Sequence, residues 1–265
     1  MSGIPAIGRV SEPSALRLSW LKKPGVGRLL AVILVLALWE AAARWMVDPR
    51  FLAGPSAMFA AIPGLFQVRG LPAALATTLG ELVASFGLSV LIGAPLGLWL
   101  GLSIRSRRRV LPIILLLYAV PQVTILPLIV MIFGIGAASK IAFGVTHAVF
   151  PIVFTISAAA QNLDRVLLNF AHLHGATRRQ TLRHVILPQI APTFFSGMRL
   201  AMVGAILGVL LAELYASSGG IGAFTRIFSD TFQAANLFAL VFLLSAMAVC
   251  LNEALRFAEA RFQRR

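Results

Sequence analysis

Three glutamates lie inside or at the edges of long apolar stretches of this chain, where an ionised carboxylate is costly. Glu40 has Arg44 four residues later, a spacing that pairs opposite charges on one face of a helix. Glu81 and Glu213 have no local partner, so each lines a polar path or pairs with a basic residue on another helix. For Glu213 we favour a hydrogen bond that holds a gate closed, because the turn Gly219–Gly222 beyond it supplies backbone donors.

Three further polar residues are candidates for the same path. Gln122 and Thr124 lie between Pro121 and Pro127 inside an apolar stretch, and two prolines interrupt a helix. Broken backbone at membrane depth persists only where protein or water surrounds it, so this segment faces an internal cavity or forms a packed kink. His147, in the next apolar stretch, could contribute to the same cavity, although a lone histidine packed against a helix is more common.

The sequence lacks the patterns that support most enzymatic chemistry. The three lysines are Lys22, Lys23 and Lys140, and none follows a glycine, so there is no phosphate-binding loop for ATP. The four histidines and the single cysteine, Cys250, show no metal-ligand spacing, and no serine occupies a nucleophile elbow. We therefore expect no catalytic residue, no bound metal and no cofactor in this chain.

Composition places these side chains in a membrane. Of the 265 residues, 59% are hydrophobic and 12% are charged, whereas soluble domains are about half apolar and a quarter charged. A soluble fold of this length could not hide so much apolar surface, so the class is a polytopic membrane protein. The net charge of +14 comes from basic residues in short segments between apolar stretches, which is not the pattern of a nucleic-acid-binding face.

Six stretches each hold about 20 or more mostly apolar residues, enough to cross the hydrocarbon core as helices. We predict an all-α protein with spans at roughly 29–47, 75–102, 111–134, 140–161, 194–215 and 237–255. The first could be a signal peptide, but the long polar segment before it favours an uncleaved helix. In the second, Gly93, Gly97 and Gly101 form a stripe that lets another helix approach closely.

The distribution of lysine and arginine predicts the orientation of the spans. Segments on one side carry 17 of these residues and segments on the other carry 5, Lys140 among them. This asymmetry places both termini in the cytoplasm, with residues 1–28 as a cytoplasmic segment and 29–265 as the transmembrane domain. Residues 48–74 become an extracytoplasmic loop. Its expected helix breakers are Pro49, Pro55, Pro63 and Pro72.

A polar, arginine-rich segment between the fourth and fifth spans has the pattern of two short helices. Apolar residues recur at helical spacing from about 163 to 174, and Gly175 suits the left-handed residue that closes a helix. Thr177 has the features of an N-cap with Gln180 as its capping-box partner, and Pro188 marks the end of the second helix. The alternative is an amphipathic segment lying on the lipid surface. The apolar face of the first helix comprises Leu163, Val166, Leu167, Phe170 and Leu173.

This segment resembles the cytoplasmic "EAA" loop of permease subunits in ATP-binding-cassette importers. The family pattern is Glu-Ala-Ala, three residues, Gly, nine residues, an aliphatic residue, one residue and Leu-Pro, and the spacing from Gly175 to Pro188 matches it. Asn169 stands where the family usually has Glu, and Phe170 replaces an Ala. The resemblance implies a cytoplasmic helix-turn-helix that docks onto a separate ATPase. The positions that inherit this coupling role are Asn169, Phe170, Ala171, Gly175, Arg178, Leu187 and Pro188.

The resemblance extends over about residues 77–255 and is closest to the branch that serves nitrate, sulfonate, taurine and thiamine-precursor importers. It implies a permease subunit that forms the pathway for a small solute of that kind, with Glu81, Gln122, Thr124, His147 and Glu213 as candidates for the pathway or its gate. The motifs that carry it are Pro121–Leu128, Phe133–Gly136, Ser139-Lys140, Ala212–Leu214 and Ser217–Gly222.

The same resemblance implies the assembly. Two permease copies, as a homodimer, would bind two ATPase subunits that hold ATP and Mg²⁺, and an extracytoplasmic binding protein would deliver the solute. The location would be a bacterial inner membrane, with lipid and no nucleic acid as a partner. The alternatives are a stand-alone secondary transporter, which should show an inverted repeat with broken helices in both halves, and a membrane assembly factor. The sequence does not identify the solute.

Overall fold

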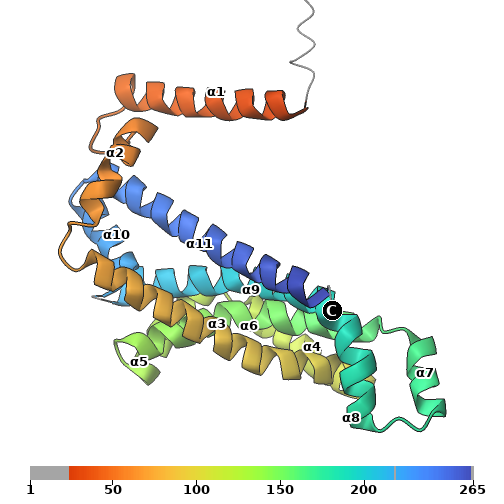
Figure 1. Ribbon diagram of the computed structural model, residues 1–265. Coiled ribbons are helices and arrows are strands. Elements are labelled where there is room, and N and C mark those ends of the chain that lie inside the picture. The colour runs from red at the N-terminus through yellow and green to blue at the C-terminus, as the bar shows by residue number, and fades with distance from the viewer. Residues whose placement is uncertain (1–23, 218, 264–265) are drawn as a thin grey trace, which may run out of the picture.

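The computed structural model describes residues 24–217 and 219–263, and the elements assigned within these ranges are helices. Figure 1 shows a bundle of long helices with short helices gathered at both of its ends, and the first described helix lies apart from the bundle. The helices are α1 (Pro24–Trp45), α2 (Pro55–Leu65), α3 (Leu71–Leu102), α4 (Ile104–Ala119), η2 (Gln122–Ile125), α5 (Leu126–Phe133), α6 (Ala137–Gln161), α7 (Arg165–Leu173), α8 (Arg178–Thr181), η3 (Leu182–Ile186), α9 (Leu187–Ala216), α10 (Ile221–Asp230) and α11 (Ala234–Gln263).

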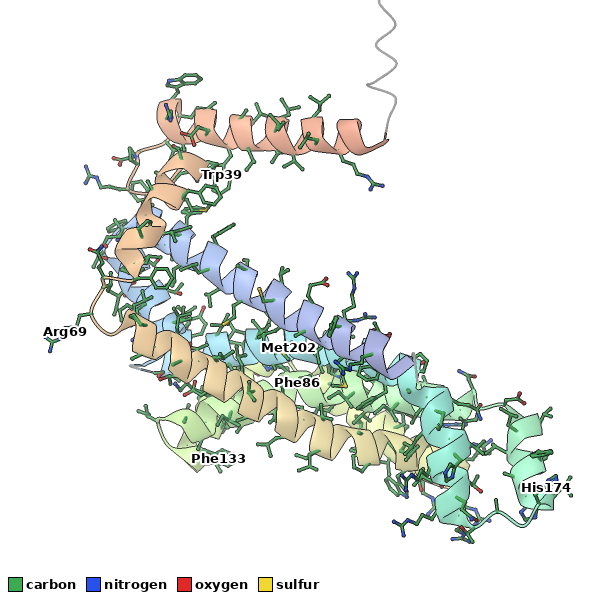
Figure 2. The ribbon with its side chains drawn as sticks, viewed as in Figure 1. Trp39, Arg69, Phe86, Phe133, His174 and Met202 are labelled. Atoms are coloured by element: carbon green, nitrogen blue, oxygen red, sulfur yellow. The ribbon has the colours of Figure 1, made fainter. Side chains whose placement is uncertain are left out.

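The centre of the bundle is formed by α3, α6 and α9, which pack closely along their lengths. The predicted glycine stripe of α3 faces α6, and a Cβ added to Gly97 would lie 2.8 Å from the carbonyl oxygen of Val153. Only glycine permits this approach, so the prediction of close helix packing is confirmed. A second layer joins α11 to this core, and Figure 2 shows Phe86 and Met202 within it.

The structure contains fewer clear membrane spans than the six predicted. Four helical runs in the described residues are long and apolar enough to cross a membrane: Leu71–Leu102, Ala137–Gln161, Arg178–Ala216 and Ala234–Arg261. A bent pair, α4 with η2 and α5, raises this number to five. The remaining predicted span, 29–47, corresponds to α1, whose apolar side chains are largely exposed. The six-span model therefore stays a prediction.

The third predicted span, 111–134, contains the expected break but not a single crossing helix. The two halves are bent by 86° between α4 and the segment Gln122–Phe133. Val120 is extended, as the residue before a proline usually is, and Pro121 has no amide hydrogen to continue the helix. The broken-helix prediction is confirmed at Pro121, whereas Pro127 lies in the first turn of α5, where proline is tolerated.

The predicted loop 48–74 is partly helical. Pro55 begins α2, Pro63 lies inside it, and Pro72 lies in the first turn of α3, so these three prolines do not break helices as expected. Helix starts accept proline because their amides have no intrahelical acceptor. Helix α2 packs against α11, and the ring of Trp39 from α1 lies 5.7 Å from that of Phe238, at the end of the bundle where α10 also lies.

Candidate functional site

Four polar side chains meet in the interior at the α10 end of the bundle, and we call this group the charged junction: Thr78, Glu81, Lys140 and Glu213. All four are buried, with at most 4% of their surface exposed. The Lys140 Nζ lies 2.5 Å from Glu81 Oε1 and 3.8 Å from Glu213 Oε1. The Thr78 hydroxyl donates a hydrogen bond to Glu213 Oε1 at 2.7 Å. The junction therefore joins α3, α6 and α9.

Helix ends explain why these charges need one another. Lys140 lies in the first turn of α6 and Glu213 in the last turn of α9, positions where the helix dipole disfavours each charge. The charge of Glu213 is compensated by Lys140, and the charge of Lys140 is compensated by both Glu213 and Glu81. Burying an ionised group costs a large amount of free energy unless an opposite charge pairs with it.

The charged junction also holds the start of α10. The amide of Ile221 donates to Thr78 Oγ1, and the amide of Gly222 donates to Glu213 Oε2, both at 2.9 Å. The N-cap residue, Gly220, has no side chain to fulfil this role and has a φ of 92°. A Cβ added to Gly220 would strike the carboxylate of Glu213. Two side chains from other helices therefore cap α10 in place of a local residue.

These contacts answer two expectations about the glutamates. The expected basic partner of Glu81 on another helix exists and is Lys140. The expected backbone donor to Glu213 also exists, in the glycine turn. The sequence predicted Lys140 as a topology residue and as part of a family motif, but not as the partner of Glu81 or Glu213, and it did not point to Thr78. One signal was available, since Lys140 begins an apolar stretch at the predicted depth of two unpaired glutamates. The predicted pair of Glu40 and Arg44 is present at 2.6 Å.

The other predicted pathway residues do not contact the charged junction. Thr124 Oγ1 donates to its own turn, at the carbonyl of Pro121, and Gln122 Oε1 is buried without a hydrogen bond to a described residue. His147 Nδ1 lies 3.0 Å from the carbonyl oxygen of Phe143, one turn earlier on α6. His147 is half-buried and lies against its own helix.

A cavity of about 610 Å³ lies between α5, the end of α9 and α10. Arg226 on α10 reaches its wall and donates hydrogen bonds to the carbonyls of Leu214 and Ser217, the free carbonyls at the end of α9. The lining comprises Leu126, Pro127, Val130, Ile135, Tyr215, Ala216, Ser217 and Arg226. The segment after Pro121 thus borders a cavity, although Gln122 and Thr124 are not among the residues that line it.

The second candidate site is the loop at the opposite end, formed by α7 and α8 (Figure 1). Asp164 caps α7 by accepting the amide of Val166 at 2.7 Å. Gly175 has a φ of 70° and donates to the carbonyl of His172, while Ala176 donates to that of Ala171. This pair of bonds is the Schellman closure, so the predicted left-handed role of Gly175 is confirmed.

The second helix of the loop starts as predicted and continues further than predicted. Thr177 and Gln180 form the capping box, with both reciprocal bonds present. The helix does not end at Pro188, because α8 passes through the π-helical turn η3 directly into α9. In that turn the amide of Leu187 bonds to the carbonyl of Leu182, five residues back. A wider turn relieves the clash that a proline ring makes with the carbonyl four residues before it.

Most of the apolar face predicted for α7 is exposed, although Leu163 packs against an interior cluster. Val166, Phe170 and Leu173 are 72%, 59% and 83% exposed, and the neighbouring Asn169 and Gly175 are exposed as well. Of the remaining coupling positions, Ala171 is buried, while Arg178, Leu187 and Pro188 are exposed. Figure 2 shows His174 at the outer corner of this loop. Between α7, α8 and the end of α3 lies a groove of about 430 Å³, to which Arg178 contributes.

Comparison with known protein families gives a match over most of the chain. The model of a family described as "Binding-protein-dependent transport system inner membrane component" matches residues 93–265. The chain is 27% identical to the formylaminopyrimidine transport permease protein ThiX of Halalkalibacterium halodurans, over 83% of this chain and 88% of that protein. It is 32% identical to the taurine transport system permease protein TauC of Escherichia coli, over 73% of this chain and 72% of that protein.

Solved structures share the fold. The chain superposes with the MetNI methionine ABC transporter in an inward-facing conformation with a TM-score of 0.61 and 22% identity, covering 75% of this chain and 94% of that chain. It superposes with a bacterial ABC transporter that imports the acidic polysaccharide alginate with a TM-score of 0.62 and 17% identity, covering 92% of this chain and 94% of that chain.

Proposed function

Because this chain belongs to the family of binding-protein-dependent transport system inner-membrane components, we propose that the loop formed by α7 and α8 docks the ATPase of an ATP-binding-cassette importer. The chain is a multi-pass inner-membrane permease subunit, and ATP hydrolysis is done by a separate subunit. Membership in this family excludes the stand-alone transporter and assembly-factor alternatives.

One observation carries the docking proposal: the apolar face of α7 is exposed next to a rigidly closed turn. Phe170 and Leu173 present large apolar side chains, and the Schellman closure at Gly175 fixes the direction of the chain beyond them. Solvent-exposed apolar side chains gathered on one helix mark an interaction site. The capping box at Thr177 then sets the start of the second helix, which runs without interruption into α9. Movement of the docked loop would therefore pass directly to a membrane helix.

The experiment compares two glycines that share a positive φ. Gly175→Val should leave the protein inserted but reduce the ATPase that co-purifies with it, because a β-branched residue is strained at a φ of 70°. Gly134→Val is the matched control, since Gly134 has a φ of 76° and equally open surroundings but lies between α5 and α6. Equal retention of the ATPase by Gly175→Val and wild type would refute the docking role.

We infer that the solute is small and is of the sulfonate, nitrate, taurine or pyrimidine kind, and that Glu81, Gln122, Thr124, His147 and Glu213 lie along its path or gate. Support comes from relatives named for taurine, aliphatic sulfonates and formylaminopyrimidine. Stimulation of ATP hydrolysis by each solute, in vesicles that contain the permease, ATPase and binding protein, tests the class. A solute outside these classes that alone stimulates hydrolysis would contradict it.

The remaining proposals concern assembly and orientation. We infer a homodimer from the resemblance to importer permeases. The charge asymmetry supports an orientation with both termini, residues 1–28 and the α7–α8 loop in the cytoplasm. Residues 1–23 lie outside the described part of the chain. A reporter that is active only in the cytoplasm should work when fused at Arg265 and when inserted within 103–109. Activity at one position but not the other would overturn the six-span topology.

A further inference from the structure

The charged junction lies at the end of the bundle opposite the proposed ATPase site, so docking does not explain it (Figure 1). We propose that Lys140 is a positioning residue, whose ammonium group holds Glu213 in place as the cap of α10 and thereby fixes α10 beside the 610 Å³ cavity. The proposal is independent of the docking role of α7.

The charge balance of the junction depends on Lys140. Two carboxyl groups, those of Glu81 and Glu213, share the ammonium group of Lys140, at 2.5 Å and 3.8 Å. In the ion pairs of the described residues, Lys140 is the one cation that contacts either carboxylate. Without it, two buried carboxyl groups would face each other, and like charges in a low-dielectric interior repel strongly. Lys140 therefore determines whether Glu213 can stay where it is.

Hydrogen bonds connect Glu213 to the start of α10. One carboxylate oxygen of Glu213 accepts the amide of Gly222, and the other accepts the hydroxyl of Thr78, which itself accepts the amide of Ile221. These are the first amides of α10, which have no acceptor within the helix. Displacing Glu213 removes one acceptor directly and loosens the hydroxyl that supplies the other.

Arg226 links α10 to the cavity. Arg226, one turn further along α10, is bound to the carbonyls of Leu214 and Ser217 and lines the cavity. Helix α10 is thus fixed to α9 at both positions, through Glu213 and through Arg226. A loosened N-terminus would shift Arg226 and change the wall of the cavity.

A positioning role and a simple ion pair between α3 and α6 predict different effects for the Lys140 and Glu81 variants. In a simple pair, removing Lys140 and removing the charge of Glu81 have the same consequence. In a positioning role, Lys140→Met leaves two carboxyl groups without a cation and displaces Glu213. Glu81→Gln instead leaves Lys140 paired one to one with Glu213, so the cap is kept.

The experiment follows the exposure of α10 directly. In a Cys250→Ser background, Ala223→Cys places a reporter on the first turn of α10, where Ala223 is buried. The rate of labelling by a water-soluble maleimide is measured in native membranes. Lys140→Met should raise the labelling rate about tenfold, which corresponds to a tenfold change in the equilibrium between the capped and the uncapped start of α10. Glu81→Gln and Lys140→Arg should stay close to the parent rate.

The matched control is Arg199→Met, which removes another ion pair that includes α9, formed by Arg199 and Glu259 at 2.9 Å near the opposite end. It should leave labelling at Ala223→Cys unchanged. If Lys140→Met does not accumulate, the double variant Lys140→Met with Glu81→Gln keeps the charge sum and should label faster than Glu81→Gln alone.

Equal labelling of Lys140→Met and Glu81→Gln would overturn the positioning role in favour of a simple ion pair, and so would unchanged labelling in Lys140→Met. A second readout uses the transport function, namely solute taken up per ATP hydrolysed in vesicles with the ATPase and binding protein. Lys140→Met should lower this ratio and Lys140→Arg should restore it. Labelling does not depend on transport, so failure of the docking proposal leaves this test intact.

Discussion

The two ends of the helical bundle differ in which side chains they bury and which they expose. At one end, charged groups are buried inside the chain, where Lys140 pairs with both Glu81 and Glu213. At the other end, Phe170 and Leu173 on α7 are apolar and remain exposed. A buried charged side chain that pairs within the chain stabilises the fold, whereas an exposed apolar side chain is available to bind another subunit. The difference separates residues that hold the permease together from residues that connect it to another subunit.

The largest expected effect comes from substitutions in the exposed apolar face of α7. Phe170→Asp with Leu173→Asp should abolish co-purification of the ATPase, because buried apolar anchors contribute about 2 kcal/mol or more each to an interface. Protein yield and insertion should be unchanged, since both side chains are exposed in the isolated subunit. The ATPase retained on the purified permease is the measurement.

The same substitution at Phe257 is the control for that experiment. Phe257 lies on α11, on the side predicted to be cytoplasmic, and is 70% exposed. Phe257→Asp should retain the ATPase. Loss of the ATPase in both variants would indicate that any charge added to exposed aromatic surface disrupts the complex, and the proposed docking face would have to be abandoned.

The features that the sequence predicted well are local ones. The Schellman closure at Gly175, the capping box at Thr177 and the stripe at Gly97 depend on residues within a few positions or on one repeated small residue. Such signals are set by backbone conformation and helix periodicity, which neighbouring residues control.

The features that were missed depend on contacts across the chain or on rare backbone geometry. Thr78 and Glu213 are 135 residues apart, so no spacing rule could join them. Pro188 was expected to end a helix, and the π-helical turn before it allows the helix to continue. The sequence does not predict α2, because prolines such as Pro55 and Pro63 usually interrupt helices.

The second prediction compares glycines at the two ends. Gly220→Ala should destabilise the protein by about 3 kcal/mol, because the new methyl group adds a collision with Glu213 to the cost of a left-handed backbone. Gly175→Ala should cost only about 1 kcal/mol, since open space surrounds that residue. Thermal unfolding of the detergent-solubilised protein gives both values. A Gly175→Ala cost equal to that of Gly220→Ala would mean that the two ends do not differ in packing.

The smallest expected effect concerns two threonines that each cap a helix, one in a buried and one in an exposed position. Thr78 and Thr177 each accept a backbone amide at a helix start, but Thr78 is buried and caps α10 from another helix, whereas Thr177 is exposed and caps its own helix. Thr78→Val keeps the shape and leaves the amide of Ile221 without an acceptor away from water, at a cost of about 1–3 kcal/mol. Thr177→Val should cost about 1 kcal/mol or less, because water can replace the lost acceptor. Amide hydrogen exchange should quicken over the first turn of α10 in one variant and over α8 alone in the other. If Thr177→Val instead quickens exchange in α10, the two ends are energetically coupled through α9, and the separation of fold from assembly drawn above would be wrong.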